Sequence, residues 1–239
     1  FLFFKLIDGV CERFHLHYQR IQTSLDILQM VARPEWSHDF FVNHLRNASK
    51  AFNEKELRAK IVFYRESKGS YLPDLNSANF YLRLDPYVPF LKTELTAGIY
   101  TLAKKPVNFL SPLKTTSALM MVMAAKFAQS KGWDEVVLLN EFGRVCEGLT
   151  SNIFLKQNNK YATPPLSEGC INGVNRKAFL QAHPEIIERP IEVEELKGSE
   201  IFFSVVDIFL RLELNAFLII SKKRSFSWLL LIPRWISFM

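Results

Sequence analysis

Three separated segments of the chain carry side chains that can act together in amine chemistry. Lys114 opens a short polar Thr-Thr-Ser segment just ahead of an apolar stretch. A lysine that is partly desolvated in this way gives up its proton more easily and becomes a usable nucleophile. Glu147 leads into an Asn-Ile-Phe strand that begins at Asn152, and Gly173 opens a later helix. One lysine among 30 basic residues is no signal by itself, so the interpretation depends on the ordered set.

Four motifs, taken in order, resemble the cofactor site of one enzyme family. They are Lys-Thr-Thr-Ser at 114–117, Glu-Gly-Leu-Thr-Ser-Asn-Ile-Phe at 147–154, Thr-Pro-Pro at 163–165 and Gly-Val-Asn-Arg at 173–176. In these motifs the chain is similar to the class IV aminotransferases, which are pyridoxal-phosphate enzymes of fold type IV. That family includes branched-chain aminotransferases, D-amino-acid aminotransferases and 4-amino-4-deoxychorismate lyases. The resemblance covers residues 2–204 and is strongest from Lys114 to Arg176.

The resemblance implies roles for Lys114, Glu147 and Asn152 in the first two motifs. Lys114 would form the Schiff base with pyridoxal 5'-phosphate and then remove the α-proton of the substrate. Glu147 would pair with the pyridine nitrogen and keep it protonated, so that the ring can accept electrons. Asn152 would order the loop around the ring. The same resemblance implies that these residues lie in one pocket.

The resemblance also implies how the phosphate is held. Backbone N–H groups that follow Gly173, at Val174 and Asn175, would bind it at a helix N-terminus, where the macrodipole favours an anion. Arg20 matches a family arginine in the first amphipathic helix, and its planar fork suits a phosphate. Asn175 departs from the threonine usual in the family, although its amide can replace the hydroxyl donor.

The chain departs from the family pattern in other places. Leu119 stands where branched-chain aminotransferases commonly carry a tyrosine, and Ser117 stands where lyases and D-amino-acid aminotransferases often carry an asparagine. Beyond residue 204 the sequence stops following the family and becomes an apolar and basic tail of unknown role. We interpret the tail as the product of a shifted reading frame or an altered C-terminus.

Hydrophobic spacing predicts the elements that must position these residues. Helices are predicted over 15–30, 39–51, 116–131 and 173–183. Strands are predicted over 2–10, 60–65, 80–84, 135–139, 144–146, 152–156 and 185–193, with a hairpin partner starting at 71–73 and a turn at 104–106.

These elements predict an N-terminal α+β domain over 1–106, a C-terminal cofactor-binding domain over 107–204 and the tail over 205–239. The resemblance implies the two-domain α+β fold of type IV, of the D-amino-acid aminotransferase kind, with the cofactor in the interdomain cleft.

Composition narrows the remaining possibilities. The 49% hydrophobic and 23% charged residues are typical of a globular protein. Three cysteines without a CxxC pair favour a reduced, cytoplasmic compartment, and the five histidines lack the spacing of a metal site. The net charge of +6 is diffuse, so we expect neither a nucleic-acid nor a membrane partner.

The leading hypothesis is a pyridoxal-phosphate enzyme of the class IV aminotransferase type that acts on an amino-acid-like substrate. The alternatives are a 4-amino-4-deoxychorismate lyase, which eliminates pyruvate from aminodeoxychorismate and leaves 4-aminobenzoate, and a non-catalytic relative on the same fold. The resemblance further implies a homodimer. The sequence does not separate the lyase from a small transaminase of the D-amino-acid type.

Overall fold

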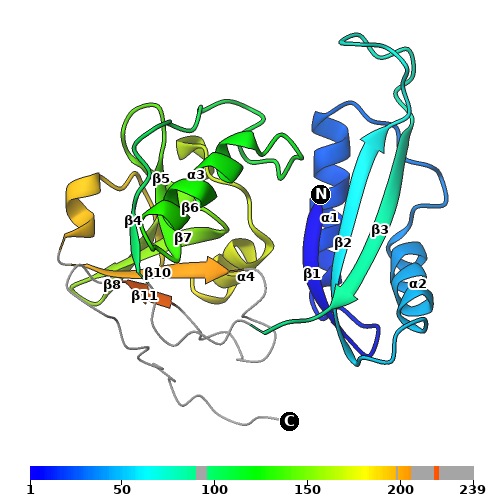
Figure 1. Cartoon of the computed structure of the whole chain (residues 1–239), viewed down its shortest axis with the longest axis horizontal. Helices are drawn as coiled ribbons and strands as arrows, with labels where there is room; N and C mark the ends of the chain where they lie inside the picture. Colours follow the sequence, from blue (N-terminus) through cyan, green and yellow to red (C-terminus); the bar gives the residue numbers. More distant parts are fainter. Residues whose placement is uncertain (90–95, 198, 206–217, 221–239) are drawn as a thin grey trace. The chain divides into compact units, whose positions relative to one another are not determined.

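The computed structural model describes residues 1–89, 96–197, 199–205 and 218–220. The chain divides into two compact units, Phe1–Pro89 and Phe90–Met239 (Figure 1). The second unit begins earlier than the expected boundary after residue 106. The reason is that Ala97–Ile99 pairs in parallel with Glu135–Leu139, and Lys105 forms a further bridge to Asn140. These contacts tie the segment before residue 106 to the second unit.

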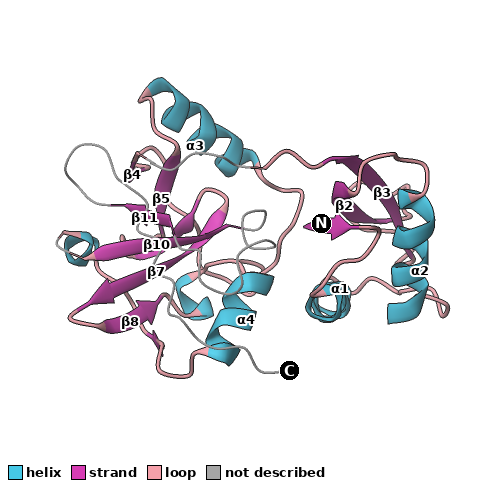
Figure 2. Cartoon of the chain, turned by 90° about the horizontal axis from the view of Figure 1, so that it is seen from below, coloured by secondary structure: helices cyan, strands magenta, loops and turns pink. Residues whose placement is uncertain are grey.

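The first unit is a three-stranded antiparallel sheet with two helices on one face (Figure 2). Its elements are β1 (Leu2–Ile7), α1 (Phe14–Ile27), α2 (His38–Ser49), β2 (Glu56–Arg65) and β3 (Ala78–Pro86). Alternate residues of β1, among them Phe4 and Leu6, point into the core because side chains alternate along a strand. Helix α2 begins at the N-cap Ser37, whose Oγ accepts a hydrogen bond from Phe40 N at 3.1 Å.

The hairpin between β2 and β3 differs from the expectation. Residues 71–73 are not the start of the partner strand, because β3 begins only at Ala78. The intervening loop is instead held by its own polar groups. Asp74 Oδ1 accepts hydrogen bonds from Ser67 Oγ at 2.7 Å and Lys68 N at 3.0 Å. These local bonds replace the cross-strand ladder that a longer hairpin would need.

The second unit contains two sheets that share a core. Its strands are β4 (Ala97–Ile99), β5 (Glu135–Leu139), β6 (Val145–Gly148), β7 (Ser151–Gln157), β8 (Lys160–Thr163), β9 (Ile187–Glu188), β10 (Glu200–Val205) and β11 (Leu218–Ile220). The strand orders are β4-β5-β6 and β11-β10-β7-β8-β9. Ile153 and Leu155 on β7 meet Val137 on β5 in the core, whereas Phe154 faces the other way and packs against Phe179.

The helices of the second unit are α3 (Leu119–Ser130) and α4 (Val174–Ala182), with short 3-10 turns at Leu166–Glu168 and Val193–Leu196. Ala124 and Ala128 pack α3 onto β5. The predicted stop at Gly132 is confirmed, since its φ is +65° and Trp133 N donates to Ala128 O. Helix α3 begins three residues later than predicted, so Lys114 lies in a non-helical segment ahead of it.

The two C-terminal predictions, the strand over 185–193 and the tail, differ in outcome. The strand predicted over 185–193 is wrong for most of its length, because only Ile187–Glu188 pairs with β8 and a 3-10 turn follows at Val193. The predicted tail begins at the end of β10, and apart from the backbone of β11 it lies outside the described residues. In the parts of the chain that are described, no helix has the length and apolar character needed to cross a membrane.

We expect Phe41→Ala to destabilise the first unit by about 3–5 kcal/mol, because it empties the centre of an aromatic cluster. Phe41 is 1% exposed and contacts the rings of Phe14, Tyr18, Trp36, Phe63 and Phe80. Urea unfolding of the purified chain measures the change. Tyr71→Ala, at a fully exposed ring, is the control and should stay within about 0.5 kcal/mol of the wild type. Equal losses in both variants would contradict this account of the core.

Candidate active site

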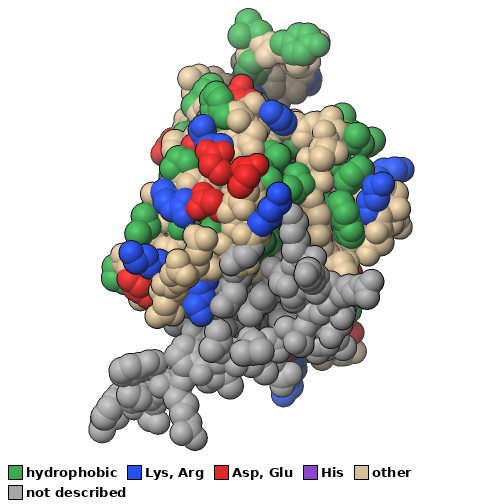
Figure 3. Space-filling view, turned by 90° about the vertical axis from the view of Figure 1, so that its left-hand side faces the viewer, with side chains coloured by type: hydrophobic (Ala, Val, Ile, Leu, Met, Phe, Trp, Pro, Cys, Tyr) green, Lys and Arg blue, Asp and Glu red, His purple; other side chains and the backbone are tan. Residues whose placement is uncertain are grey.

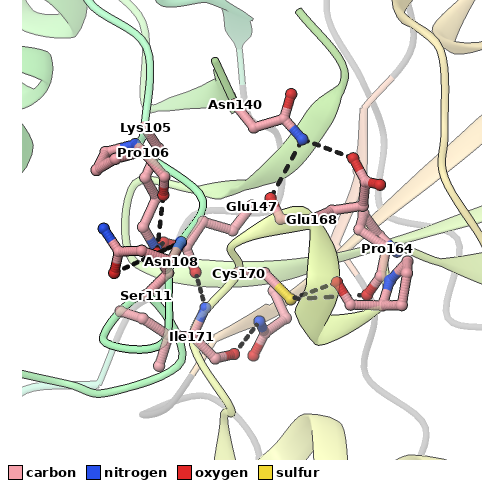
Figure 4. Close-up of polar contacts among 12 residues, drawn as sticks. Lys105, Pro106, Asn108, Ser111, Asn140, Glu147, Pro164, Glu168, Cys170 and Ile171 are labelled. Carbon is pink, nitrogen blue, oxygen red and sulfur yellow. Dashed lines mark hydrogen bonds and ion pairs between the residues drawn. The ribbon is translucent and has the colours of Figure 1, made fainter. Parts of the chain in front are cut away.

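Glu147 lies at the centre of the candidate site. It is on β6 opposite Leu138 and is 3% exposed. Its Oε2 accepts a hydrogen bond from Ile171 N at 2.8 Å, and its Oε1 forms an ion pair with Lys105 Nζ (Figure 4). A buried carboxylate requires such partners, because burial strips it of water. Glu147 is thus buried with a partner on each oxygen, and its role toward a cofactor stays a prediction.

The loop at 171–173 joins the predicted site residues. Asn152 Nδ2 donates to Ile171 O at 2.8 Å, next to the amide that Glu147 binds. On the other side, Asn172 N donates to Pro112 O at 2.9 Å. Lys114 follows two residues after Pro112, and its side chain is half-buried. The structure therefore brings the Lys114 segment, Glu147 and Asn152 to one loop.

Gly173 is the N-cap of α4, and the helix begins without a side-chain cap. The first backbone bond of the helix runs from Lys177 N to Gly173 O at 2.9 Å. The N–H groups of a first helical turn are in general suited to bind an anion, and the phosphate role of the Val174 and Asn175 amides stays a prediction. A Cβ added at Gly173 would lie 2.1 Å from Asn152 Oδ1, so only glycine fits beside that amide.

Arg20 lies on α1 in the first unit, whereas the other predicted site residues lie in the second. Burial lowers the pKa of its guanidinium to about 10. Its Nε is buried and has no hydrogen-bond partner in the described part of the chain. A buried donor of this kind is costly to leave unpaired, which is compatible with a ligand there. The phosphate role of Arg20 stays a prediction.

Lys105 is the site residue that sequence reasoning missed. The turn predicted at 104–106 is wrong for Lys105. This residue is 8% exposed, and its backbone pairs in parallel with Asn140, just after the end of β5. Lys105 N donates to Leu139 O at 2.8 Å, and Lys105 O accepts from Glu141 N at 2.9 Å. In the sequence, Lys105 sits between another lysine and a proline, so no spacing distinguishes it from the exposed Lys104.

A second buried carboxylate supports this segment. Glu168 accepts two bonds from Arg144, at 2.7 Å from Nε and 2.8 Å from Nη2. It accepts another from Asn140 Nδ2 at 2.6 Å (Figure 4). The hydrogen bonds with Glu168 raise the pKa of Arg144. Asn140 is the residue that bridges to Lys105. The network therefore fixes Asn140, just after the end of β5, and with it the backbone of Lys105, whose side chain reaches Glu147.

A third buried carboxylate shapes the turn between β6 and β7. Glu135 Oε1 accepts from Val136 N at 2.9 Å and Leu149 N at 2.7 Å. Its Oε2 accepts from the hydroxyls of Thr150 and Ser151. Burial raises the pKa of Glu135, and these hydrogen bonds offset part of that effect. The turn that it organises leads directly into Asn152.

The cysteines offer no reactive thiol at the site. Cys146 and Cys170 are next to Glu147 and Ile171 in sequence, and both are buried and unbridged. Burial raises the pKa of Cys170 to about 11 and raises that of Cys146 further. The thiols therefore stay protonated near neutral pH. Among the described residues, no group of three or more His, Cys, Asp or Glu side chains is placed to hold a metal.

Comparison with protein families decides the assignment. The sequence profile of the family amino-transferase class IV matches residues 2–205 of the 239. The chain belongs to the class IV aminotransferases. The resemblance drawn from the motifs is thereby confirmed. The profile ends at the last residue of β10, where the sequence departs from the family pattern.

Individual class IV aminotransferases resemble the chain in sequence and in structure. A probable branched-chain-amino-acid aminotransferase of Thermotoga maritima is 28% identical over 187 residues, which is 78% of this chain. The chain spans 63% of the length of that relative. A branched-chain aminotransferase of Thermoproteus uzoniensis superposes with a TM-score of 0.76 at 23% identity, over 92% of this chain and 76% of that one.

A protein of Legionella pneumophila that is proposed to be a 4-amino-4-deoxychorismate lyase superposes with a TM-score of 0.75. The two chains are 19% identical, and the match covers 86% of this chain and 81% of that one. At these identities the solved structures indicate the fold alone. The predicted α+β fold of type IV is confirmed by them.

We expect Gly173→Ala to disturb the contact between α4 and β7, because the new Cβ overlaps Asn152 Oδ1. The affinity for a phosphate-bearing ligand such as pyridoxal phosphate should fall at least about tenfold, since a shift of the helix N-terminus costs on the order of 1.4 kcal/mol or more in binding. Titration followed by cofactor absorbance measures it. Added to a chain that already carries Asn152→Ala, in which the overlap is absent, Gly173→Ala should cost less affinity than it costs in the wild type. An equal cost in both backgrounds would contradict the steric explanation.

Glu135 gives a pH-dependent prediction. Its pKa is raised in the folded chain, so its contribution to stability is fully present below about pH 4.5 and is lost as the pH rises through the folded value. The variant Glu135→Gln has no titrating group at this position and lacks this dependence. The difference in unfolding free energy, wild type minus Glu135→Gln, should therefore fall as the pH rises from about 4 to about 8.

Urea unfolding at a series of pH values measures this difference. The matched control is Glu194→Gln, at an exposed glutamate of the 3-10 turn Val193–Leu196. Profiles of wild type and Glu135→Gln that run parallel over the whole range would contradict the assignment of a raised pKa to Glu135.

Proposed function

We propose that the chain is a pyridoxal-phosphate-dependent enzyme of the aminotransferase type, with Lys114 as its Schiff-base lysine. Class IV aminotransferases use pyridoxal 5'-phosphate, and this family membership supports the cofactor. The observation that carries the proposal is the convergence on one loop of the Lys114 segment, the buried Glu147 and the N-terminus of α4. These three parts are an amine, an anion and a phosphate site.

The residues present fit the cofactor. The buried carboxylate of Glu147 suits a ring nitrogen, and the uncapped N-terminus of α4 suits a phosphate. Gly173 gives the close approach that a backbone-bound phosphate needs, with Asn152 against it. When bound, pyridoxal phosphate supplies an aldehyde that takes up the substrate's amino group and a ring that withdraws electrons from the α-carbon.

Two lysines compete for the Schiff-base role. The ring nitrogen and the carbon that bears the aldehyde stand at opposite ends of the pyridine ring, so the amine and the carboxylate must lie a ring's width apart. Lys105 Nζ is in contact with Glu147 and is too near to the carboxylate for that role. The segment of Lys114 instead meets the loop at 171–173 through Pro112, whose carbonyl accepts from Asn172 N. In the proposed site its amine stands at the aldehyde end of the ring, away from the carboxylate. This difference favours Lys114.

The protein's own residues divide the remaining work. Glu147 holds positive charge at the ring nitrogen, and Ile171 N fixes the carboxylate that does so. The amides of Val174 and Asn175 bind the phosphate, and Asn152 keeps the loop in place. Lys114 Nζ would take the proton from the substrate's α-carbon and return it. The phosphate role of Arg20 completes the proposed set.

The substrate is an amino acid or an amino-acid-like molecule. The relative in Thermotoga maritima favours a transaminase, while the likeness to the Legionella pneumophila protein keeps the lyase as the second candidate. Leu119, where branched-chain enzymes commonly have a tyrosine, is 76% exposed at the start of α3. Keto-acid formation from an amino-acid panel, set against 4-aminobenzoate release from aminodeoxychorismate, distinguishes the two reactions. We further propose a cytoplasmic homodimer, as the family resemblance implies.

We predict that borohydride reduction of the chain with pyridoxal phosphate places the cofactor on Lys114. In the proposed site the amine of Lys114 faces the aldehyde of the bound cofactor, whereas exposed lysines meet the aldehyde only from solution. Peptide mapping by mass spectrometry locates the adduct, and the absorbance of the bound cofactor reports its formation. Lys114→Ala should lose both signals.

The matched control is Lys126→Ala, at an exposed lysine of α3, which should keep the adduct and the absorbance. An adduct on Lys105 would overturn the choice of lysine. Labelling scattered over surface lysines would instead favour a non-catalytic relative on this fold.

A further inference from the structure

Lys105 is a buried cation that the proposed chemistry does not yet use. Its ammonium pairs with Oε1 of Glu147, the carboxylate oxygen that Ile171 N does not occupy. Both groups are buried, at 8% and 3% exposure for the two residues. A pair in such surroundings is weakly screened, so each charge acts strongly on any third charge nearby.

The position of Lys105 is built into the fold. Its backbone is hydrogen-bonded on both sides, to Leu139 O and to Glu141 N, and Asn140 between these two is held by Glu168. Lysine side chains on helices and loops commonly extend into solvent. The side chain of Lys105 is instead buried, and its backbone is fixed by hydrogen bonds. The ammonium is therefore a permanent neighbour of Glu147.

We propose that Lys105 is a positioning residue that shares Glu147 with the ring nitrogen of pyridoxal phosphate and so weakens the protonation of that nitrogen. The inference rests on the proposed function, in which Glu147 meets the ring. A protonated ring brings a second positive charge to a carboxylate that already has one, and like charges at this range oppose each other. A lone glutamate would hold the ring proton more firmly. Lys105 thus sets how strongly the ring withdraws electrons.

The test compares pyridoxal phosphate with its 1-deaza analogue, in which a C–H group replaces the ring nitrogen. Affinities of the full chain for both are measured at neutral pH, and their ratio isolates the contribution of the nitrogen. Lys105→Met should raise the preference for pyridoxal phosphate at least about tenfold, because a neighbouring charge shifts an ionisation by one unit or more. Lys105→Arg keeps the charge and should keep the wild-type ratio.

Two controls fix the interpretation. Lys104→Met, at the exposed neighbouring lysine, should leave the ratio unchanged. Glu147→Gln should abolish the effect of Lys105→Met when the two are combined, since the shared carboxylate is then gone. A merely structural role for Lys105 would weaken the binding of both ligands alike and leave their ratio where it was.

Lys105→Met leaves Glu147 without its cation, so the variant can fail to fold. Lys105→Gln provides a second variant, because its amide keeps a hydrogen-bond donor for Glu147 and removes the charge. In this variant too the preference for pyridoxal phosphate over the 1-deaza analogue should rise. An unchanged ligand ratio in either variant would overturn the inference. Failure of the wild type to bind pyridoxal phosphate at all would instead contradict the proposed function.

Discussion

A buried carboxylate has lost its hydration and must be paired with protein groups that the fold places beside it. In the second unit this constraint comes from Glu147. One oxygen is held by Lys105 from the segment after β4, and the other by the amide of Ile171 from the loop before α4. Segments 42 residues earlier and 24 residues later in the sequence are thus tied to one point on β6. The loop then reaches Asn152 and Pro112 through its own backbone, so the geometry around α4 depends on that one charge.

The other buried carboxylates act in the same way at a smaller scale. Glu168 holds Arg144 and Asn140, and Glu135 holds the turn from Gly148 to Ser151. Each side chain accepts several hydrogen bonds, so the cost of its burial is met within the second unit. At the surface, by contrast, acidic and basic side chains are interspersed on the face in Figure 3, and they do not form a field of one sign there. The positive net charge therefore says little about a partner.

Much of the fold was predictable because it follows from local patterns. The apolar residues of Leu2–Ile7, the helical spacing around Leu25 and the glycine at 132 each act on neighbouring residues, and each led to the right element. Glu147 and Asn152 were found through a motif in one continuous stretch. Lys105 was not, since its partner is 42 positions away and its neighbours in sequence are those of a turn. The strand expected over 185–193 was wrong for a related reason, because its length depends on pairing with β8, a distant segment. Only Ile187 and Glu188 pair with that strand.

The segment between Lys105 and Lys114 is a loop held by its own hydrogen bonds. It is anchored at one end where Lys105 joins β5 and at the other where Pro112 O meets Asn172 N. Between these anchors Ser111 Oγ donates to Pro106 O at 2.8 Å and accepts from Asn108 N at 3.0 Å, while Phe109 is 74% exposed. Extra residues added near Phe109 would extend outward without changing either anchor. The chain can thus vary in length here, or accept a grafted peptide, while Lys105 stays beside Glu147 and Pro112 stays bound to Asn172.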